Sequence, residues 1–284
     1  MLDRILFPIA KRFVAGRTIQ EAVRVVQGLN EQGISATLDV LGENVRDKAS
    51  AQAAAERYLT TLDWIERCRV QSNVSLKLTQ MGLDINREFC YSNLVRICER
   101  ATKTGNFVRI DMEGSRYTEA TLSLVLDLYR DYRNVGIVIQ SYLRRSAADL
   151  QRINEKGAPV RLCKGAYKEP ATIAYQTMSE IRENFKKLAE VLFTKGNYPA
   201  IATHDDQLID WTRHYVRQHQ INTAHFELQM LYGVRPETQR TLARQGYRLR
   251  VYVPYGTHWL PYFSRRLRER KENVYFVLRN LFKR

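Results

Sequence analysis

The sequence predicts an eight-stranded parallel (β/α)₈ barrel of the TIM type, and three observations predict it. From about residue 34 onward, short runs of β-branched and apolar residues alternate with longer stretches of helical spacing. About eight such units fit into the 284 residues, whereas an open doubly wound sheet usually has about five or six strands. Strands that alternate with helices pair in parallel through right-handed crossovers, and no GxGxxG motif follows a strand to favour a dinucleotide-binding sheet.

The individual elements follow from local patterns of side chains. The predicted strands are 34–41, 74–78, 107–113, 135–142, 160–167, 200–205, 226–231 and 250–256. Apolar residues at helical spacing form three stripes: Leu122, Val125, Leu126 and Tyr129; Met178, Ile181, Phe185, Leu188 and Leu192; and Val274, Val277, Leu278, Leu281 and Phe282. Each stripe predicts a helix with one buried face.

The chain is predicted to be one domain over 1–284, because no linker rich in Pro, Gly or Ser divides it. Residues 1–33 precede the first strand and are interpreted as an N-terminal helical lead-in. Charged residues interrupt the opening apolar segment at positions 3, 4, 11 and 12, so it does not resemble a secretory signal. No apolar run reaches the length of a membrane span.

Charge and cysteine content bear on partners and location rather than on fold. Forty-five Lys and Arg against 30 Asp and Glu give a formal net charge of +15. A hydrophobic content of 44% excludes a disordered chain. The four cysteines, at positions 68, 90, 98 and 163, lack the spacing of a disulfide scaffold or a CxxC zinc site. We therefore expect a globular protein of a reducing, cytoplasmic compartment.

Polar side chains gather where the predicted strands end. They are Asp39, Glu43, Lys77, Arg109, Asp111, Glu113, Gln140, Arg161, Lys164, Thr203, His204, Asp205, Tyr252 and Tyr255. A barrel interior is normally filled by branched apolar side chains, and its chemistry lies at the carboxyl ends of the strands. A single one of these residues has ordinary structural explanations, but their shared position predicts a polar binding site at that end.

The residue types favour an anionic ligand over a metal ion. Asp111, Glu113, His204 and Asp205 have the chemistry of metal ligands, yet the five histidines form no HxH or HExxH pair. Cationic side chains among the strand-end residues point instead to an anion. The KGA segment at 164–166 supplies a cation and a backbone without a Cβ, which suits close approach by a phosphate. No metal is therefore expected.

A second anion site is suggested by two adjacent arginines, Arg265 and Arg266, near the end of the barrel. Adjacent guanidiniums on a helix point about 100° apart and can hold a carboxylate from two directions. A solvated basic face is the competing interpretation, since Arg268, Arg270 and Lys271 follow directly. Proximity to the loop after the last strand keeps the first interpretation open.

Eight blocks in chain order resemble the monofunctional bacterial proline dehydrogenases, which are related to the dehydrogenase domain of the bifunctional proline utilisation A proteins. The blocks are LDVLGE (38–43), SLKLTQMGLD (75–84), RIDME (109–113), GIVIQSYLRRS (136–146), RLCKGAYKEP (161–170), ATHD (202–205), FELQMLYGVRPE (226–237) and YVPYGTHWLPYFSRRLRER (252–270). They extend over nearly the whole chain. The resemblance implies a distorted (β/α)₈ barrel that holds FAD non-covalently at its C-terminal face, beneath an extra C-terminal helix.

The resemblance also implies a reaction. L-proline would be oxidised to Δ¹-pyrroline-5-carboxylate, the first step of proline catabolism to glutamate. Hydride would pass from C5 of proline to N5 of the flavin, and the electrons would then pass to a quinone. Because Tyr252 would clash with a 4-hydroxyl group, the alternative of a flavin dehydrogenase for another cyclic amino acid, such as hydroxyproline, ranks second.

Site residues are carried over from the resemblance position by position. Asp111 and Arg161 match active-site positions. The substrate-binding positions match Lys77, Arg265, Arg266, Tyr252, Leu231 and Glu43, with Tyr252 against the proline ring and Glu43 able to pair with Arg265. The flavin positions match Met112, Gln140, Arg161, Lys164, Gly165, Ala166, Thr203 and His204. The chain departs from the family at Cys163, where an apolar residue such as Val is common, and in the added charges Arg268 and Lys271.

The excess of positive charge allows three further interpretations. A nucleic-acid-binding role finds no support, because no helix-turn-helix, zinc finger or RNP-type motif is present. Contact with an anionic membrane is a better use for the charge than nucleic acid, since the segment 265–284 is basic and a quinone is lipid-soluble. The protein would then lie peripherally on the inner face of the cytoplasmic membrane. A surface merely biased towards Lys and Arg is an equally weighted interpretation. Its oligomeric state stays open.

Overall fold

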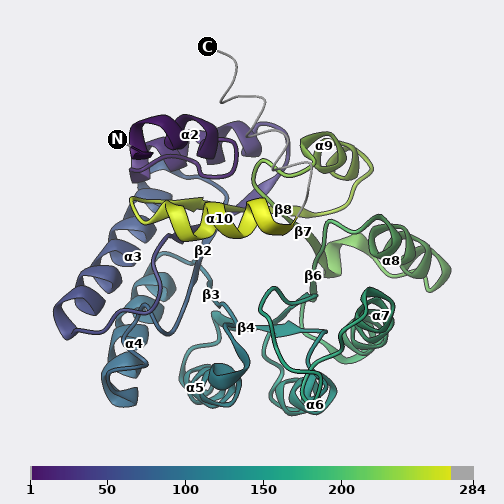
Figure 1. Cartoon of the computed structure of the whole chain (residues 1–284). Helices are drawn as coiled ribbons and strands as arrows, with labels where there is room; N and C mark the ends of the chain where they lie inside the picture. The colour runs from purple at the N-terminus through teal and green to yellow at the C-terminus, as the bar shows by residue number, and fades with distance from the viewer. Residues whose placement is uncertain (1, 270–284) are drawn as a thin grey trace.

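The computed structural model describes residues 2–269 and contains a closed parallel barrel of eight strands (Figure 1). The strands are β1 (Ser35–Val40), β2 (Ser72–Leu76), β3 (Val108–Ile110), β4 (Val135–Gln140), β5 (Val160–Cys163), β6 (Ala200–Ala202), β7 (Glu227–Leu231) and β8 (Leu249–Tyr255). Neighbours in sequence pair with each other, and β8 pairs with β1 to close the barrel. The predicted (β/α)₈ fold is confirmed.

Helices surround the barrel, and one lies across its mouth. They are α1 (Leu2–Ala10), α2 (Ile19–Asn30), α3 (Lys48–Cys68), α4 (Arg87–Lys103), α5 (Thr118–Asp131), α6 (Ser146–Lys156), α7 (Met178–Lys195), α8 (Asp206–Gln218), α9 (Pro236–Arg244) and α10 (Trp259–Glu269). α2 contacts β1, β8 and α3, so it occupies the ring position that a helix after β8 normally fills. α10, drawn in yellow, crosses the barrel opening instead (Figure 1). This exchange is the distortion of the barrel.

α10 is held in place by an apolar cluster that is separate from the barrel core. Phe7, Phe13, Trp259 and Phe263 are all buried and belong to this cluster. The ring centroids of Phe7 and Trp259 lie 5.4 Å apart, and those of Phe13 and Phe263 lie 6.3 Å apart. The N-terminal segment therefore forms part of the seat of the helix that covers the mouth.

The interior of the barrel differs from the expected apolar filling. Along the strands, apolar residues such as Leu38 and Val74 belong to the core shared with the helices. The alternate positions are polar and contact one another inside the barrel: Thr37 donates a hydrogen bond to Asn73, and Arg161 contacts Asp111. The sequence predicted polar residues only at the carboxyl ends of the strands, but the structure also has them inside the barrel.

Two sequence expectations about helices need correction or lie out of reach. Leu122, Val125 and Tyr129 are buried in α5, as expected, but Met178 at the start of α7 is 45% exposed. Met178 lines the cavity at the barrel mouth rather than the core. The stripe from Val274 to Phe282, and the basic segment beyond Glu269, lie outside the described residues. None of the helices within 2–269 combines the length and apolar character needed to cross a membrane.

Candidate active site

A cavity of about 430 Å³ lies at the carboxyl ends of the strands, beneath α10. Its lining includes all the predicted site residues except Glu43: Lys77, Asp111, Met112, Gln140, Arg161, Lys164, Gly165, Ala166, Thr203, His204, Leu231, Tyr252, Arg265 and Arg266. They come from β4, β5, β7 and β8, from the segments that follow β2, β3, β5 and β6, and from α10. Segments from residue 77 to residue 266 therefore meet in one place because the strands are parallel and end at the same rim.

A buried network of charges forms the floor of this cavity. Lys77, which directly follows β2, is 9% exposed. Its Nζ lies 3.3 Å from both carboxylate oxygens of Asp39, 3.3 Å from Oδ2 of Asp111 and 3.2 Å from the hydroxyl of Tyr252. The sequence placed Lys77 within a strand, but β2 ends one residue earlier. Lys77 and Asp111, assigned separately from the sequence, therefore form an ion pair.

Asp111 is the centre of the network. Its Oδ1 accepts hydrogen bonds from Oγ of Ser75 at 2.6 Å and from Nη1 of Arg161 at 2.8 Å. Its Oδ2 accepts from the hydroxyl of Tyr252 at 2.7 Å, besides the contact with Lys77. Asp111 therefore fixes the position of residues from β2, β5 and β8 through a single carboxylate.

The network fixes which group carries the proton. Burial alone would raise the pKa of Asp111, but the Lys77 and Arg161 cations outweigh it, so this pKa is lowered. Burial alone would lower the pKa of Lys77, but the Asp39 and Asp111 carboxylates outweigh it and raise that pKa well above its usual value. Lys77 is thus a cation and Asp111 an anion at neutral pH.

Asp39, Ser75 and Tyr58 complete the network. The sequence placed Asp39 in the polar strand-end group without giving it a role, and it did not identify Ser75 or Tyr58. Asp39 is 1% exposed, and burial raises its pKa. The hydroxyl of Tyr58 donates to Oδ1 of Asp39 at 3.2 Å. Asp39 and Ser75 carry a sequence signal, because each is polar within a predicted apolar strand. Tyr58 carries none, since it lies on α3 at a position like any buried aromatic residue.

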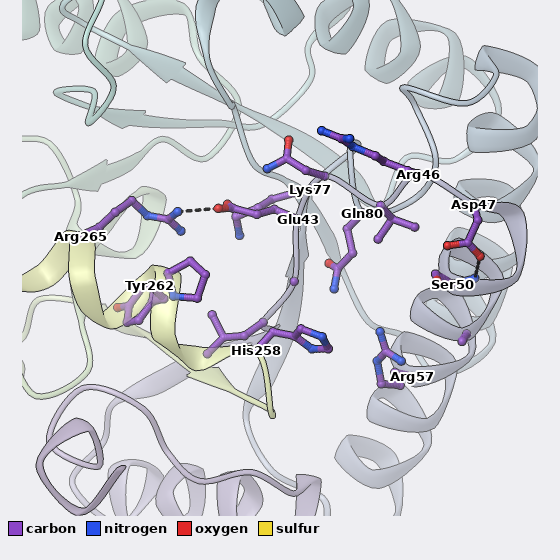
Figure 2. Close-up of a pocket in the computed structure, with 16 residues that line it drawn as sticks. Glu43, Arg46, Asp47, Ser50, Arg57, Lys77, Gln80, His258, Tyr262 and Arg265 are labelled. Carbon is purple, nitrogen blue, oxygen red and sulfur yellow. Dashed lines mark hydrogen bonds and ion pairs between the residues drawn. The ribbon is translucent and has the colours of Figure 1, made fainter. Parts of the chain in front are cut away.

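The two arginines of α10 have different surroundings. Nη1 of Arg265 donates to Oε1 of Glu43 at 2.7 Å, as expected for this pair, and Figure 2 shows the side chain extending from α10 toward Glu43. Glu43 belongs to the loop between β1 and α3, where a second cavity of about 440 Å³ lies. Arg265 lines both cavities, so the ion pair lies between them. Arg266 is 9% exposed and its guanidinium lies 5.1 Å from the ring centroid of Tyr262.

The segment after β5 presents its backbone to the cavity. Gly165 has φ +107°, and a Cβ at this position would lie 2.2 Å from Cδ1 of Tyr142. Only glycine fits without displacing that ring. Nζ of Lys164 donates to Oδ2 of Asp205 at 2.9 Å, and Nε of Arg182 donates to the same oxygen at 2.9 Å. Lys164 had been assigned to the strand, but β5 ends at Cys163.

Several polar atoms of the cavity wall have no partner within the described part of the chain. They are Oε1 of Gln140 and both Nε and Nη2 of Arg161. Buried polar atoms without partners are rare in folded proteins, and they commonly mark a ligand site. In the segment after β6, Nε2 of His204 accepts a hydrogen bond from the backbone of Leu231 at 2.8 Å, so the neutral ring carries its proton on Nδ1.

One predicted member of the strand-end group is in the wrong place. Arg109 was grouped with Asp111 at the carboxyl end of β3, yet its side chain lines a different cavity at the opposite end of the barrel. Arg109 and Asp111 are two residues apart, so their side chains lie on the same face but about 6.6 Å apart along the strand direction. Arg109 is therefore not part of this site.

Comparisons with known proteins agree with this geometry. Residues 22–279 match the family described as proline dehydrogenase. The chain is 43% identical to proline dehydrogenase 1 of Bacillus subtilis (strain 168) over 275 residues, which are 97% of this chain and 91% of the relative. It is 38% identical to the proline dehydrogenase of Deinococcus radiodurans over 283 residues, 98% of this chain and 91% of the relative.

A solved structure gives the same fold. Proline utilization A from Bdellovibrio bacteriovorus, inactivated by N-propargylglycine, superposes with a TM-score of 0.85 at 27% identity. The match covers 92% of this chain but 32% of the larger protein. The family match over most of the chain, the two bacterial relatives and the shared barrel lead to one conclusion: this chain belongs to the proline dehydrogenase family.

Proposed function

We propose that this protein uses non-covalently bound FAD to oxidise L-proline to Δ¹-pyrroline-5-carboxylate. The observation that carries the proposal is the composition of the mouth cavity. It combines two arginines on a covering helix, a buried Lys77–Asp111–Tyr252 network and wall atoms that lack hydrogen-bond partners within residues 2–269. The arginines and the buried network suit a small zwitterion, and the unpartnered wall atoms suit a large polar cofactor.

The wall residues fit a flavin. An isoalloxazine edge offers both donors and acceptors, which suits the unpartnered amide oxygen of Gln140 and the Nε and Nη2 edge of Arg161. The backbone at Gly165 allows close approach, and Lys164 supplies a cation for phosphate. We assign Met112, Ala166, Thr203 and His204 to the same group because they line the same cavity. When bound, FAD supplies the hydride acceptor for C5 of proline and the route of electrons to a quinone.

The substrate would be held mainly through its carboxylate. Proline is small and zwitterionic, so charge-assisted hydrogen bonds from Arg265, Arg266 and Lys77 give most of the orientation. Tyr252 and Leu231 offer apolar surface to the ring. Glu43 would orient Arg265 through their ion pair. Asp111 and Arg161 are the proposed catalytic residues: Asp111 holds Tyr252 and Arg161 in place, and Arg161 stabilises negative charge that develops beside it.

The proton positions limit what Lys77 and Asp111 can do. Because its pKa is raised well above the usual value, Lys77 stays protonated and serves as a cation rather than as a base. Asp111 stays ionised and has both oxygens occupied by donors. Neither group is therefore proposed to take the amine proton, which is lost to solvent so that proline reacts with a neutral nitrogen.

Anaerobic reduction tests the proposal directly. The purified protein should be yellow, release FAD on denaturation and lose its colour when L-proline is added without oxygen. Arg266→Met should raise the KM for L-proline at least about tenfold and leave the FAD content unchanged, because charge-assisted bonds to the carboxylate are lost. The exposed Arg87→Met is the matched control. A protein that cannot be loaded with FAD, or whose colour persists with L-proline, contradicts the proposal.

Hydroxyproline gives a test of substrate selection. Tyr252 is held by hydrogen bonds to Asp111 and Lys77, so its ring cannot easily turn aside for a 4-hydroxyl group. We therefore expect kcat/KM for trans-4-hydroxy-L-proline to be at least about tenfold below that for L-proline, and Tyr252→Ala to narrow the difference. Equal efficiencies in the unaltered enzyme would favour the alternative of a less specific cyclic amino acid dehydrogenase.

A further inference from the structure

A third cavity, of about 730 Å³, lies at the N-terminal face of the barrel. It is lined by residues at or near the start of strands, among them Asn73, Phe107, Pro159, Tyr198 and Glu227. None of its described lining residues belongs to the cavity at the barrel mouth. The N-terminal face of such a barrel usually serves stability. Here it contains a buried arginine, Arg109, that has no part in the proposed reaction.

Arg109 is built rigidly into this cavity. It is 3% exposed, and its Nη1 donates to the carbonyl oxygens of Pro159 at 2.7 Å and of Ile137 at 3.0 Å. The guanidinium lies 4.8 Å from the ring centroid of Phe107. On the other side is Gly136, where a Cβ would come within 2.7 Å of Nη1. The glycine, the ring and the two carbonyls together fix the plane of the guanidinium.

The opposite edge of this guanidinium has no partner within the described chain. Nε of Arg109 is buried without a hydrogen bond. Among residues 2–269, Nη2 has no hydrogen-bond partner and no carboxylate forms an ion pair with Arg109. The Nε and Nη2 edge is the one that binds two oxygens of a carboxylate or phosphate in parallel. Arg161 presents the same unpaired edge at the mouth, where the flavin is proposed to lie.

Glu227 attracts Arg109 electrostatically, but its oxygens are hydrogen-bonded to other side chains. Glu227 binds Nε of Arg250 through both oxygens, at 2.8 and 3.0 Å, and also accepts from Tyr198. Glu66, on the rim, pairs with Arg100 outside the cavity.

Two more arginines, Arg69 and Arg133, are exposed on the rim of the cavity. Burial, together with the guanidiniums of Arg161 and Arg250, lowers the pKa of Arg109 to about 9, and the carboxylates of Glu227 and Asp111 do not offset this effect. The lining therefore has an excess of positive charge at its centre and at its rim.

We propose that this cavity is a binding site for a small oxyanion, a carboxylate or phosphate, held by the Nε and Nη2 edge of Arg109 and attracted by Arg133 and Arg69. The site lies at the opposite end of the barrel from the redox site and shares no described lining residue with it. It stands independently of the reaction proposed above.

Titration of the FAD-loaded enzyme tests the site with two probes, malonate and inorganic phosphate. Each is compared with chloride at equal ionic strength by calorimetry and by the midpoint of thermal unfolding. We expect saturable binding of at least one probe and a rise in the midpoint that chloride does not produce. Malonate binding alone identifies a carboxylate site, and phosphate binding alone identifies a phosphate site.

Variants locate the bound anion. Arg109→Met should weaken binding at least about tenfold, and Arg109→Lys should weaken it less, because charge is kept but the planar edge is lost. Arg133→Glu, on the exposed rim, should weaken binding about threefold or more, whereas the neighbouring Arg130→Glu should not. The rim variants keep the test valid if Arg109→Met does not fold. Arg266→Met should bind the probe normally.

Three results would overturn the site. The first is a response to both probes that equals the response to chloride. The second is binding that survives Arg109→Met and Arg133→Glu. The third is binding that disappears in Arg266→Met, which would place the anion in the proline pocket. Activity with L-proline is measured separately in each variant. If the proposed reaction is not found, the binding results still decide whether the anion site exists.

Discussion

Lys77 forms ion pairs with two buried carboxylates, so the stability of the fold depends on pH at the acidic and alkaline extremes. A raised lysine pKa stabilises the fold below the unfolded value of about 10.4, and this stabilisation is lost as the pH rises through the folded pKa. A lowered aspartate pKa stabilises the fold above the unfolded value of about 3.9, and this stabilisation is lost as the pH falls through the folded pKa. Between these limits both contributions are complete.

Lys77→Met should therefore destabilise the protein by ~3–5 kcal/mol at pH 8, because Asp39 and Asp111 are left buried without their shared cation. The carboxylates then gain raised pKa values, so the variant should recover stability as the pH falls toward 5. Urea unfolding at both pH values measures the difference. Lys156→Met, on the exposed face of α6, is the control. Equal stability losses at pH 5 and pH 8 would contradict this account.

Gly165 is constrained by conformation and by contact, whereas Gly157 is constrained by conformation alone. Gly165→Ala should cost ~1–3 kcal/mol and reduce the FAD content, since the Cβ meets Tyr142. Gly157→Ala should cost about 1 kcal/mol, because Gly157 has φ +74° with open space around it, and it should keep its FAD. Flavin absorbance per protein and thermal unfolding distinguish the two. Full FAD content in Gly165→Ala would show that FAD binding does not need close approach to the backbone at residue 165.

Single residues were predicted well where an unusual side chain interrupts a strand pattern. Asp111 and Lys77 are of this kind, and the barrel brings them to 3.3 Å as expected. Tyr58 could not be predicted, because its contact with Asp39 depends on how α3 packs against β1. Arg109 was misplaced for a related reason: the sequence gives the strand, but the depth of a side chain along the barrel depends on strand stagger.

At the scale of elements, α10 carries Arg265 and Arg266, the two arginines proposed to bind the substrate, so we expect its docking to control the site. Phe263 is 2% exposed and contacts Phe13 and Trp259. Phe263→Ala should destabilise the protein by ~3–5 kcal/mol and raise the KM for L-proline, because α10 loses its apolar seat. Leu260→Ala on the same helix removes a side chain that is 52% exposed, and it should change stability by less than about 0.5 kcal/mol. A normal KM in Phe263→Ala would show that other contacts suffice.

The eight strands were all located from their apolar runs, because buried parallel strands give a continuous signal. Their ends were less certain: β2 and β5 end before Lys77 and Lys164. The ring position of α2 could not be predicted from its own sequence, since it depends on α10 lying across the mouth. Met178 was assigned to a core stripe because periodicity does not distinguish a core from a cavity wall.

At the scale of the whole molecule, the barrel separates two polar regions with different surroundings. The closed sheet pairs β1 with β8, so residues 35–40 and 250–255 run side by side from one end of the barrel to the other. Asp39 and Tyr252 lie toward the mouth, while Arg250 binds Glu227 toward the opposite face. The polar interior therefore reaches the proposed redox site at one end and the proposed anion site at the other.

The net charge of +15 belongs to the whole chain, and it leads to the prediction that the protein binds anionic membranes reversibly. Each Lys or Arg near such a surface contributes about 1 kcal/mol at low ionic strength, and salt screens the attraction. The protein should co-sediment with vesicles that contain phosphatidylserine, remain in solution with neutral phosphatidylcholine vesicles, and be released by high salt. A quinone in the bound vesicles should then be reduced faster than the same quinone in neutral vesicles. Sedimentation that is indifferent to lipid charge and salt would show that the positive surface has no membrane role, and the electron acceptor would have to meet the protein in water.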